Sequence, residues 1–385
     1  MQGCYQDDVE ETLKELPKDL DETYARMLRK IPPTASRDRV IRLLQCLSVA
    51  IRPPHVEELA EVLALDFDGP EGAPPELKGR RPLEDRKRDV LSMCSSLITL
   101  VGNDGYDFIQ FSHFSVKEFL TSHRLSTSEQ YKDISRFHIK DEDAHTTLAQ
   151  ACLGTLLRLD RLDGSLGLKE YASQHWVKHA QFGTVSTRIE IGMRRLFDSA
   201  KPYFAAWLKL HDIDDRQDDI YEGSDNSADF DSPDLAPDLY NSAIFDKSAD
   251  RGSPLYYASL CGFRDLAAHV IGEHREQVNV RGGHYHFPLV AALYNGHDDV
   301  TALLCQYYAD MDTPLDAPLQ VASMDGRIDV VRWLLDNGAN PNVQQDDYQS
   351  PIDLAVVGGH EEVVRTLLEH PDGVCIISCT LLSCT

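Results

Sequence analysis

The order of apolar and polar positions repeats in the C-terminal third of the chain. Four segments there share proline, an aliphatic residue, alanine and glycine at nearly the same spacing. They are SPLYYASLCGF from Ser253, FPLVAALYNGH from Phe287, APLQVASMDGR from Ala317 and SPIDLAVVGGH from Ser350. Each segment is followed by an apolar run with helical spacing, namely DLAAHVI, DVTALLC, DVVRWLL and EVVRTLL. The pattern predicts four successive repeats of two helices each.

Three positions of this repeat have simple physical roles. Proline suits the first turn of a helix, where its missing N–H would be unpaired anyway, and alanine lets two helices approach closely. Glycine is expected to end the first helix, where the backbone needs a positive φ. These residues are Pro254, Pro288, Pro318 and Pro351, Ala258, Ala292, Ala322 and Ala355, and Gly262, Gly296, Gly326 and Gly359. Because one repeat cannot bury its apolar face alone, neighbouring repeats are expected to stack.

The proline positions give repeat lengths of 34, 30 and 33 residues (254 to 288, 288 to 318 and 318 to 351). A period near 33 with this motif resembles the ankyrin repeat, which predicts an array of four repeats over residues 253–373. Glycine follows the second helix only once, as Gly338, while His274, Tyr308 and Pro371 take that place elsewhere. The 30-residue interval shortens the loop after the second repeat, so this finger is expected to depart from the usual hairpin.

Apolar positions at helical spacing also mark the N-terminal region. Helices are expected within residues 6–31 and over 36–51, 55–65 and 89–98, with a surface loop over the Gly-, Pro- and charge-rich residues 66–84. Asp104-Gly105 is a turn signal, so residues 96–113 are expected to form a β-hairpin. Capping boxes are expected at Asp19 with Glu22 and at Ser115 with Glu118. Helices followed by a hairpin predict a winged-helix arrangement.

Three phrases in this region carry a family resemblance. LPKDLDETYARMLRKI, RPPHVEELAEVLA and IQFSHFSVKEFL resemble the winged-helix region that follows the NACHT module in fungal STAND-type NTPases, over about residues 10–125. That family commonly ends in ankyrin repeats, as this chain does. The resemblance implies an intramolecular regulatory role for the winged helix rather than DNA binding. It also implies a part in signal-dependent assembly and recognition, including non-self recognition in fungi.

The whole chain is expected to be mainly α, with a winged-helix or helical bundle and one β-hairpin followed by an ankyrin-repeat α-solenoid. The expected domains are a winged-helix-like domain over 1–125, a helical connector over 126–210, an acidic disordered linker over 211–252, ankyrin repeats over 253–373 and an unstructured tail over 374–385. Residues 211–250 hold 13 Asp and Glu residues against Arg216 and Lys247, so they carry 11 (13 − 2) of the 25 net negative charges.

The motifs of several chemistries are missing from the sequence. No G-x-x-x-x-G-K-[ST] occurs, so the phosphate cradle of the NACHT module is absent and nucleotide binding is not expected to carry over. No zinc-type His/Cys spacing is found, and Arg216 and Gln217 break a possible calcium loop that starts at Asp212. No G-x-S-x-G occurs. The chain is therefore predicted to be no enzyme and to need no metal or cofactor.

Composition narrows the class of partner and the location. A net charge of −25 argues against binding nucleic acid through its phosphates, and no apolar run is long enough for a transmembrane helix. The N-terminus shows no signal peptide, and the nine cysteines include no C-x-x-C pair. These features predict a cytoplasmic protein with free thiols. The basic residues between 78 and 88 fit a solvated loop edge better than a nuclear localisation signal.

The ankyrin resemblance also implies where a partner would bind. Ankyrin arrays contact proteins through the concave edge of their first helices and through their fingers. The concave positions correspond to Leu260, Cys261, Tyr294, Asn295, Met324, Asp325 and Val357, and the finger positions to His284, His286, Asp346, Asp347 and Gln349. Leu260, Tyr294 and Met324 are expected to be exposed apolar contacts. The alternative is that they pack against the acidic linker or the helical connector.

These observations predict a non-enzymatic interaction or scaffold protein that binds a protein partner through its ankyrin repeats. An alternative is the regulatory and sensor half of a larger ATP-dependent NACHT-type switch, possible in non-self recognition. A third possibility is a decayed gene product without function. The shortened repeat and the cysteine-bearing tail are the observations that suggest it.

Overall fold

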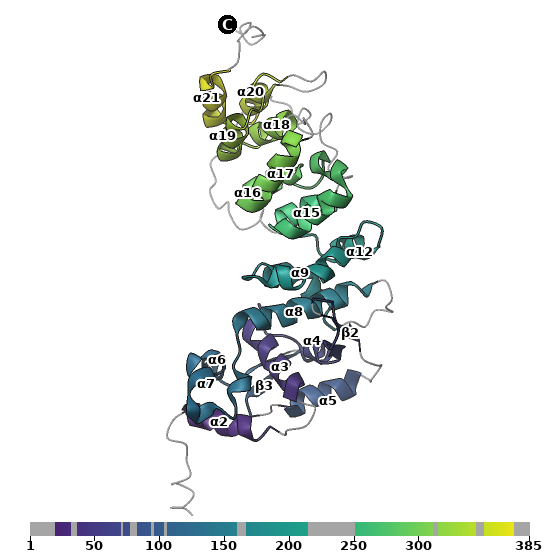
Figure 1. Ribbon diagram of the computed structural model, residues 1–385, viewed down its shortest axis with the longest axis vertical. Coiled ribbons are helices and arrows are strands. Elements are labelled where there is room, and N and C mark those ends of the chain that lie inside the picture. The colour runs from purple at the N-terminus through teal and green to yellow at the C-terminus, as the bar shows by residue number, and fades with distance from the viewer. Residues whose placement is uncertain are drawn as a thin grey trace, which may run out of the picture. The chain divides into compact units, whose positions relative to one another are not determined.

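The computed structural model describes residues 20–31, 37–70, 72–77, 83–93, 96–103, 106–159, 167–214, 251–310, 315–343 and 350–372. The chain divides into two compact units, the N-terminal unit Met1–His211 and the array Asp212–Thr385. Most of the regular structure is helical, and the described strands form two two-stranded antiparallel sheets (Figure 1). The mainly α fold class is therefore confirmed, whereas the finer domain boundaries stay predictions.

The N-terminal unit begins with helices and a β-hairpin. Its elements are α2 (Leu20–Arg29), α3 (Arg37–Val49), α4 (Val56–Val62), α5 (Leu83–Met93), β3 (Ile98–Asn103), β4 (Tyr106–Phe111) and α6 (Phe114–Thr121). β3 and β4 pair antiparallel, with Ile98 opposite Phe111 and Asn103 opposite Tyr106. A backbone bond from Ile109 N–H to the Pro54 carbonyl (2.9 Å) ties β4 to the chain just before α4. The predicted hairpin is confirmed.

Three local predictions for this region need correction. Helix α5 spans Leu83–Met93 rather than 89–98, because Ile98 already starts β3. The stretch expected to be a loop contains a short ladder between β1 (Leu65–Asp66) and β2 (Glu76–Leu77). Helix α6 is capped by His113, whose Nδ1 accepts from the Ser115 N–H (3.2 Å), so the predicted capping box at Ser115 does not form. Asp19 of the other predicted box lies outside the described residues.

The rest of the N-terminal unit is helical, as predicted. It contains α7 (His123–Thr127), α8 (Asp141–Leu156), α9 (Lys169–Ala180), α10 (Val185–Arg188), α11 (Glu190–Leu196) and α12 (Tyr203–Leu210). Trp176 of α9 and Trp207 of α12 are fully buried and meet edge to face, with ring centres 5.3 Å apart. The Trp207 indole also donates to the Ser173 carbonyl (3.0 Å), which fixes α12 on α9.

A chain of hydrogen-bonded polar groups crosses this core. The Tyr171 hydroxyl accepts from the Ile51 N–H (3.1 Å) and lies 2.8 Å from His179 Nε2. Because the Tyr171 oxygen already accepts from Ile51, its own hydrogen is available for His179. His179 can then donate from Nδ1 to His145 Nδ1, which is 2.8 Å away. Burial and the neighbouring histidines lower the pKa of His179 to about 3, so the network favours the neutral ring.

The array consists of paired helices. They are α14 (Pro254–Leu260) and α15 (Arg264–Glu273), α16 (Pro288–Tyr294) and α17 (Asp298–Asp310), α18 (Asp316–Met324) and α19 (Ile328–Asp336), and α20 (Pro351–Val357) and α21 (Glu361–Glu369). Within the array, the first helices pack on one another in succession, and α15 packs on α17 and α19 on α21, whereas between the second and third repeats α16 contacts α19 (Figure 1). The repeat alanines are fully buried between them. Gly262, Gly296, Gly326 and Gly359 have φ values of 74°, 70°, 70° and 73°, as their predicted role requires.

The second repeat ends differently from the third. Helix α17 has 13 residues, whereas α19 has 9 and is followed by Gly338 with a φ of 90°. In place of a glycine, α17 carries Tyr308, which is buried and donates its hydroxyl hydrogen to the Val278 carbonyl (3.1 Å). The longer helix therefore accounts for part of the missing loop. The finger that follows, with its expected departure from a hairpin, includes residues 311–314, which lie outside the described part.

The acidic stretch is the predicted linker over residues 211–252, and both of its ends lie on the first repeat. The Tyr257 hydroxyl donates to Asp212 Oδ1 (2.6 Å), and the Tyr256 hydroxyl donates to Asp214 Oδ2 (2.8 Å). Arg251 Nε lies 3.6 Å from Asp212 Oδ2. Residues 212–214, predicted to belong to a disordered linker, are thus bonded to the array because two tyrosine hydroxyls face them. Residues 215–250 and the predicted tail over 374–385 lie outside the described part.

Candidate interaction surface

The predicted concave positions share one place in the fold. Leu260, Tyr294, Met324 and Val357 are the last residues of the first helices α14, α16, α18 and α20. A glycine with positive φ follows each of these helix ends within two residues and turns the chain toward the second helix. The regular spacing of the repeat therefore brings these four residues to corresponding positions along the array.

One further position of the repeat joins the first three of these helix ends to the next repeat. It is the residue directly after the helix-ending glycine. His297 Nε2 donates to the Leu260 carbonyl (3.0 Å), and His360 Nε2 donates to the Met324 carbonyl (2.8 Å). In the third repeat this position is Arg327, whose guanidinium carbon lies 3.9 Å from the centre of the Tyr294 ring. Sequence reasoning missed this role, although Gly-His, Gly-Arg and Gly-His at one repeat position were a visible signal.

An aromatic row runs from the first finger (residues 281–287) to the third repeat. It consists of His284, Tyr285, Tyr294 and Arg327. The His284 and Tyr285 rings meet edge to face with centres 5.0 Å apart, and Tyr285 lies on Tyr294 with centres 4.5 Å apart and planes 35° apart. Arg327 covers the Tyr294 ring. Tyr285 is only 2% exposed and supports the Tyr294 ring, whereas exposed His284 and half-buried Tyr294 and Arg327 are the members of the row that reach the surface.

The exposure of the predicted contact residues differs from the expectation. Leu260, Tyr294 and Met324 are half-buried rather than exposed, since each helix end is covered by a side chain of the next repeat. Cys261 is only 3% exposed, and burial raises the pKa of its thiol. It packs in the core of the array, and its predicted contact with a partner stays a prediction. Val357 is 64% exposed.

The remaining predicted residues divide into three groups. His284 and Asn295 are exposed. His286 is half-buried with a φ of 62°, and burial and the nearby charges of Arg281 and His284 lower its pKa to about 4. Asp346, Asp347 and Gln349 lie outside the described residues, so their predicted finger position stays a prediction.

On this surface the carboxyl group of Asp325 lies near basic side chains. Asp325, the half-buried C-cap of α18, has a raised pKa because burial penalises its charged form. Arg327, His284 and His360 act in the opposite direction and favour the carboxylate. These groups come from the third and fourth repeats and from the first finger, so their effect on Asp325 shows that the stacked repeats bring them together.

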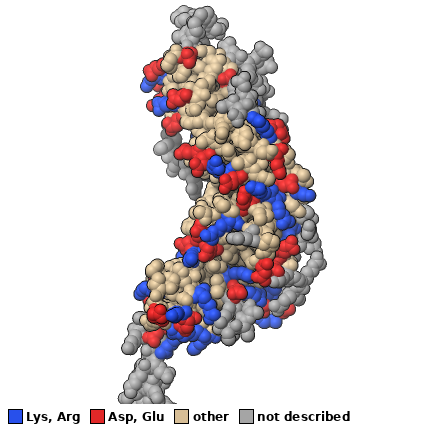
Figure 2. All heavy atoms as spheres, viewed as in Figure 1, with Lys and Arg blue, Asp and Glu red and all other residues tan. Residues whose placement is uncertain are grey.

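The surface charge is mixed where it can be seen. Figure 2 shows Lys and Arg interspersed with Asp and Glu over the described residues of the face it displays. Within the described part of the chain, no group of three or more His, Cys, Asp or Glu residues is placed to hold a metal ion. Among the same residues, no helix is long and apolar enough to cross a membrane.

The last repeat carries a second apolar surface. Val356, Val364 and Leu368 line a groove of about 480 Å³ together with His360 and Arg365. Val356 and Leu368 are 49% and 44% exposed. The groove lies on α20 and α21, which end the described array.

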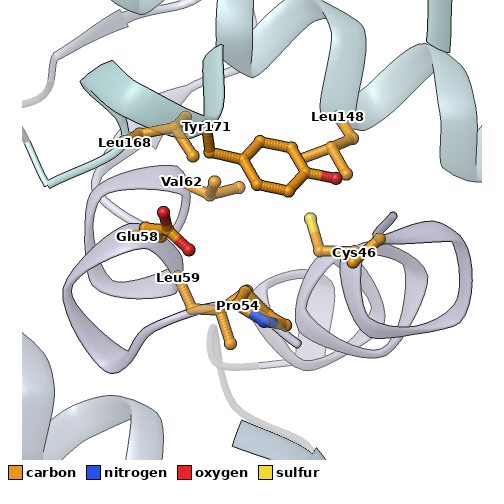
Figure 3. A pocket seen from close by; sticks show the side chains of 9 residues that line it. Cys46, Pro54, Glu58, Leu59, Val62, Leu148, Leu168 and Tyr171 are labelled. Atoms are coloured by element: carbon orange, nitrogen blue, oxygen red, sulfur yellow. The ribbon is translucent and has the colours of Figure 1, made fainter. Parts of the chain in front are cut away.

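A small cavity in the N-terminal unit is no candidate for ligand binding. It lies among α3, α4, α8 and α9, and Figure 3 shows the Cys46 sulfur pointing toward the Tyr171 ring across it. Its volume is about 10 Å³, which is room for at most one water molecule. Burial raises the pKa of the Cys46 thiol to about 12, so this cysteine is an inert core residue.

Comparison with protein families identifies both parts of the chain. Residues 16–130 match the family described as the GPI inositol-deacylase winged helix domain, and residues 319–368 match the family of ankyrin repeats. The chain contains a winged helix domain and ankyrin repeats. Both are non-catalytic domains, and the winged helix family is associated with NACHT proteins. The predicted resemblance is confirmed at this level.

Three curated proteins are similar to the chain over different lengths. Azaphilone pigments biosynthesis cluster protein L of Monascus ruber is 30% identical over 320 residues, which cover 78% of this chain and 61% of the relative. Human transient receptor potential cation channel subfamily A member 1 is 39% identical over 61 residues, 16% of this chain and 6% of the channel. Putative E3 ubiquitin-protein ligase XBAT35 of Arabidopsis thaliana is 41% identical over 61 residues, 16% of this chain and 13% of the ligase. The chain thus spans about three-fifths of the first relative and far less of the other two.

Proposed function

We propose that this chain is a non-enzymatic interaction protein that binds a protein partner through the aromatic row and the helix ends beside it. The observation that carries the proposal is that Tyr294 and Arg327, both half-buried, are stacked across successive repeats, with buried Tyr285 supporting the Tyr294 ring. Tyrosine and arginine are the residue types that most often dominate binding energy at protein interfaces. Here they are held in place before any partner arrives, which lowers the entropic cost of binding.

The chemistry around the row suits a protein rather than a small ligand or nucleic acid. The row is flanked by half-buried Met324 and Asp325 and by exposed Asn295, so aromatic, aliphatic and polar contacts lie close together. Interfaces commonly combine an apolar centre with a polar rim in this way. The acidic balance of the whole chain opposes binding to phosphates.

The test is partner binding by the full chain carrying Tyr294→Asp and Met324→Asp. After a captured partner is identified and purified, its affinity for the double variant should fall at least about 30-fold, equivalent to roughly 2 kcal/mol for one dominant contact residue. Tyr307→Asp is the matched control, because Tyr307 is also half-buried and also lies under an arginine, Arg275, but on the second helix α17. Equal affinity of the double variant and the wild type would refute the proposed surface.

A second candidate function is that of the regulatory and sensor half of a larger NACHT-type switch. Such a switch could act in non-self recognition. The match of residues 16–130 to a NACHT-associated winged helix family favours it. In that case an upstream P-loop should be encoded in the same transcript, and the native protein should be larger than the 43.3 kDa of this chain. Mapping the 5′ end of the transcript and the size of the native protein separates the two candidates. The cytoplasmic location stays a prediction.

A further inference from the structure

The carboxylate of Asp214 fixes two consecutive residues of the first finger, which we define as residues 281–287. Asp214 Oδ2 accepts from the His284 N–H (2.5 Å) and from the Tyr256 hydroxyl (2.8 Å). The Tyr256 oxygen in turn accepts from the Tyr285 N–H (3.1 Å). One side chain from the start of the acidic stretch therefore holds the His284 amide directly and the Tyr285 amide through Tyr256.

The finger has little freedom to settle elsewhere while these bonds hold. Tyr256 is fully buried, and the backbone of Gly283 lies so close to its ring that a Cβ there would sit 2.3 Å from Cζ. Gly283 also has a φ of 74°, which a side chain would strain. The finger is thus seated on the Tyr256 ring, and the Tyr256 hydroxyl is oriented by Asp214.

The acidic stretch is attached at a second point, two residues earlier. Asp212 Oδ1 accepts from the Tyr257 hydroxyl (2.6 Å), and Arg251 Nε lies 3.6 Å from Asp212 Oδ2. Asp212 and Asp214 thus face two adjacent tyrosines of α14. This pairing fixes the register of the stretch on the first repeat, so that Asp214 reaches the finger.

The contacts of the finger continue into the surface proposed to bind a partner. Tyr285, whose amide is held through Tyr256, is 2% exposed and lies on the Tyr294 ring. Arg327 covers Tyr294 at 3.9 Å. A displacement of the finger must move the Tyr285 ring, and the Tyr294 ring and the guanidinium packed on it can then no longer keep their positions.

We propose that Asp214 is a positioning residue for the aromatic row, so that the start of the acidic stretch controls the geometry of the partner-binding surface. This inference rests on the proposed function only in that the aromatic row is taken to bind a partner. The physical statement is that the contacts of residue 214 on the first repeat determine how Arg327 of the third repeat lies on Tyr294. Events that release residues 212–214 would then weaken partner binding.

The experiment compares four full-length proteins, namely the wild type, Asp214→Ala, Asp214→Asn and Asp265→Ala. Hydrogen exchange of residues 282–287 reports on the finger, and the NMR shift of the Arg327 side chain, displaced by the ring current of Tyr294, reports on the row. In Asp214→Ala, the His284 and Tyr285 amides should exchange at least about tenfold faster, because their acceptors are removed or released. The Arg327 signal should move toward the value of an arginine not stacked on a ring.

The two other variants separate positioning from general damage. Asparagine offers an amide oxygen at the same place, so Asp214→Asn should restore slow exchange and most of the Arg327 shift. Asp265 is exposed and pairs with Arg264 on the first turn of α15, so Asp265→Ala should change neither signal. Tyr294→Ala gives the reference Arg327 shift for a missing ring.

Two results would overturn the proposal. The first is an Arg327 shift that stays at its wild-type value although the finger exchanges faster. The second is an equal rise in exchange over the whole array, including Val363 and Leu367 in α21, which would make Asp214 a general stability residue. If Asp214→Ala unfolds the array, Tyr256→Phe decides, since it keeps the ring but removes the hydroxyl that links Asp214 to Tyr285.

These readouts need no partner, so their outcome is independent of the test of the proposed function. If Tyr294→Asp with Met324→Asp leaves binding unchanged while the Arg327 shift still follows Asp214, the coupling stands and the proposed function fails. The opposite result removes the coupling and leaves the binding surface in place.

Discussion

The N-terminal unit and the ankyrin array differ in the polar contacts inside each of them. The contacts in the N-terminal unit join residues much farther apart in the sequence than those in the array. In the N-terminal unit, Tyr171 bonds to Ile51, and Arg158 pairs with Glu61 (3.2 Å), so the partners are 120 and 97 residues apart. In the array, His297 bonds to Leu260 and His360 to Met324, at separations of 37 and 36 residues, about one repeat. These polar contacts thus connect distant parts of the sequence in the N-terminal unit, whereas in the array they connect adjacent repeats.

This difference predicts how each region responds to damage. A unit with one core and a connected buried network loses stability as a whole when one member is removed. A repeat array is approximately a sum of repeats and interfaces, so a local change acts mainly on the adjacent repeats. Four substitutions or conditions test the comparison.

The largest effect is expected in the aromatic core of the N-terminal unit. Trp207→Ala removes a fully buried side chain and its hydrogen bond to Ser173, and it should lower the free energy of unfolding of this unit by about 3–5 kcal/mol. Denaturant unfolding followed by hydrogen exchange in each unit measures the effect. Exchange within residues 254–372 should stay at the wild-type level. A parallel loss of protection there would show that the two units unfold together.

Acid should destabilise the N-terminal unit through His179. Its native pKa of about 3 lies below the ordinary value near 6.5, so the unfolded state takes up a proton first as the pH falls. The stability contributed by the neutral ring is present above pH 6.5 and is lost progressively toward pH 3. Between pH 6.5 and 4 the free energy of unfolding should fall by about 2–3 kcal/mol from this group.

The control for this pH dependence is a pair of glutamine variants. His179→Gln can still accept from Tyr171 and donate to His145 but cannot titrate, so its stability should change less with pH. His123→Gln replaces an exposed histidine and should keep the wild-type slope. Equal slopes in all three proteins would contradict the assignment to His179.

Two glycines of the array, alike in backbone, should differ in their response to alanine. Gly296 and Gly326 both have a φ of 70°, so alanine costs about 1–2 kcal/mol at either position from backbone strain alone. At Gly296 a Cβ meets nothing within 4 Å, whereas at Gly326 it would lie 2.4 Å from His360 Nδ1. Gly326→Ala should therefore cost about 1 kcal/mol more than Gly296→Ala, because His360 must leave its hydrogen bond to Met324. Thermal unfolding of the two variants gives the difference.

The smallest effect is expected for the bond between repeats itself. His360→Ala removes one half-buried hydrogen bond and should cost about 0.5–1.5 kcal/mol, with faster exchange confined to the third and fourth repeats. His297→Ala should have a similar effect on the first and second repeats, and the two losses should add in the double variant. Strong non-additivity would mean that the array unfolds as one cooperative block.

How far each region could be predicted follows from the same difference. The repeat motif predicted the helix pairs, the buried alanines and the positive φ of the glycines, because each of these recurs at a fixed place in the motif. The Asp104-Gly105 signal likewise predicted the β-hairpin, since turn and strands are adjacent. By contrast, α5 was misplaced because helical periodicity did not show that β3 already begins at Ile98. The network around His179 was not found because periodicity does not reveal which distant residue supplies a partner.

For the candidate surface, too, the sequence did not reveal which residues of a neighbouring repeat contact a given side chain. The alignment of the repeats correctly gave the helix ends Leu260, Tyr294 and Met324 a common position, but it could not tell that the next repeat covers them. It marked Cys261 as a contact residue, although its side chain turns into the core. Exposure depends on neighbours one repeat away, and those neighbours vary in type along the array.

The sequence by itself determined the two domain types, the number of repeats and the glycines with positive φ that follow each first helix, because these depend on local backbone preferences and on a pattern that recurs. The tertiary structure alone decided that Asp212 and Asp214 belong to the array and that Tyr285, Tyr294 and Arg327 form one row. These contacts depend on the directions in which side chains leave separate helices and loops, and those directions are fixed only when the repeats have stacked.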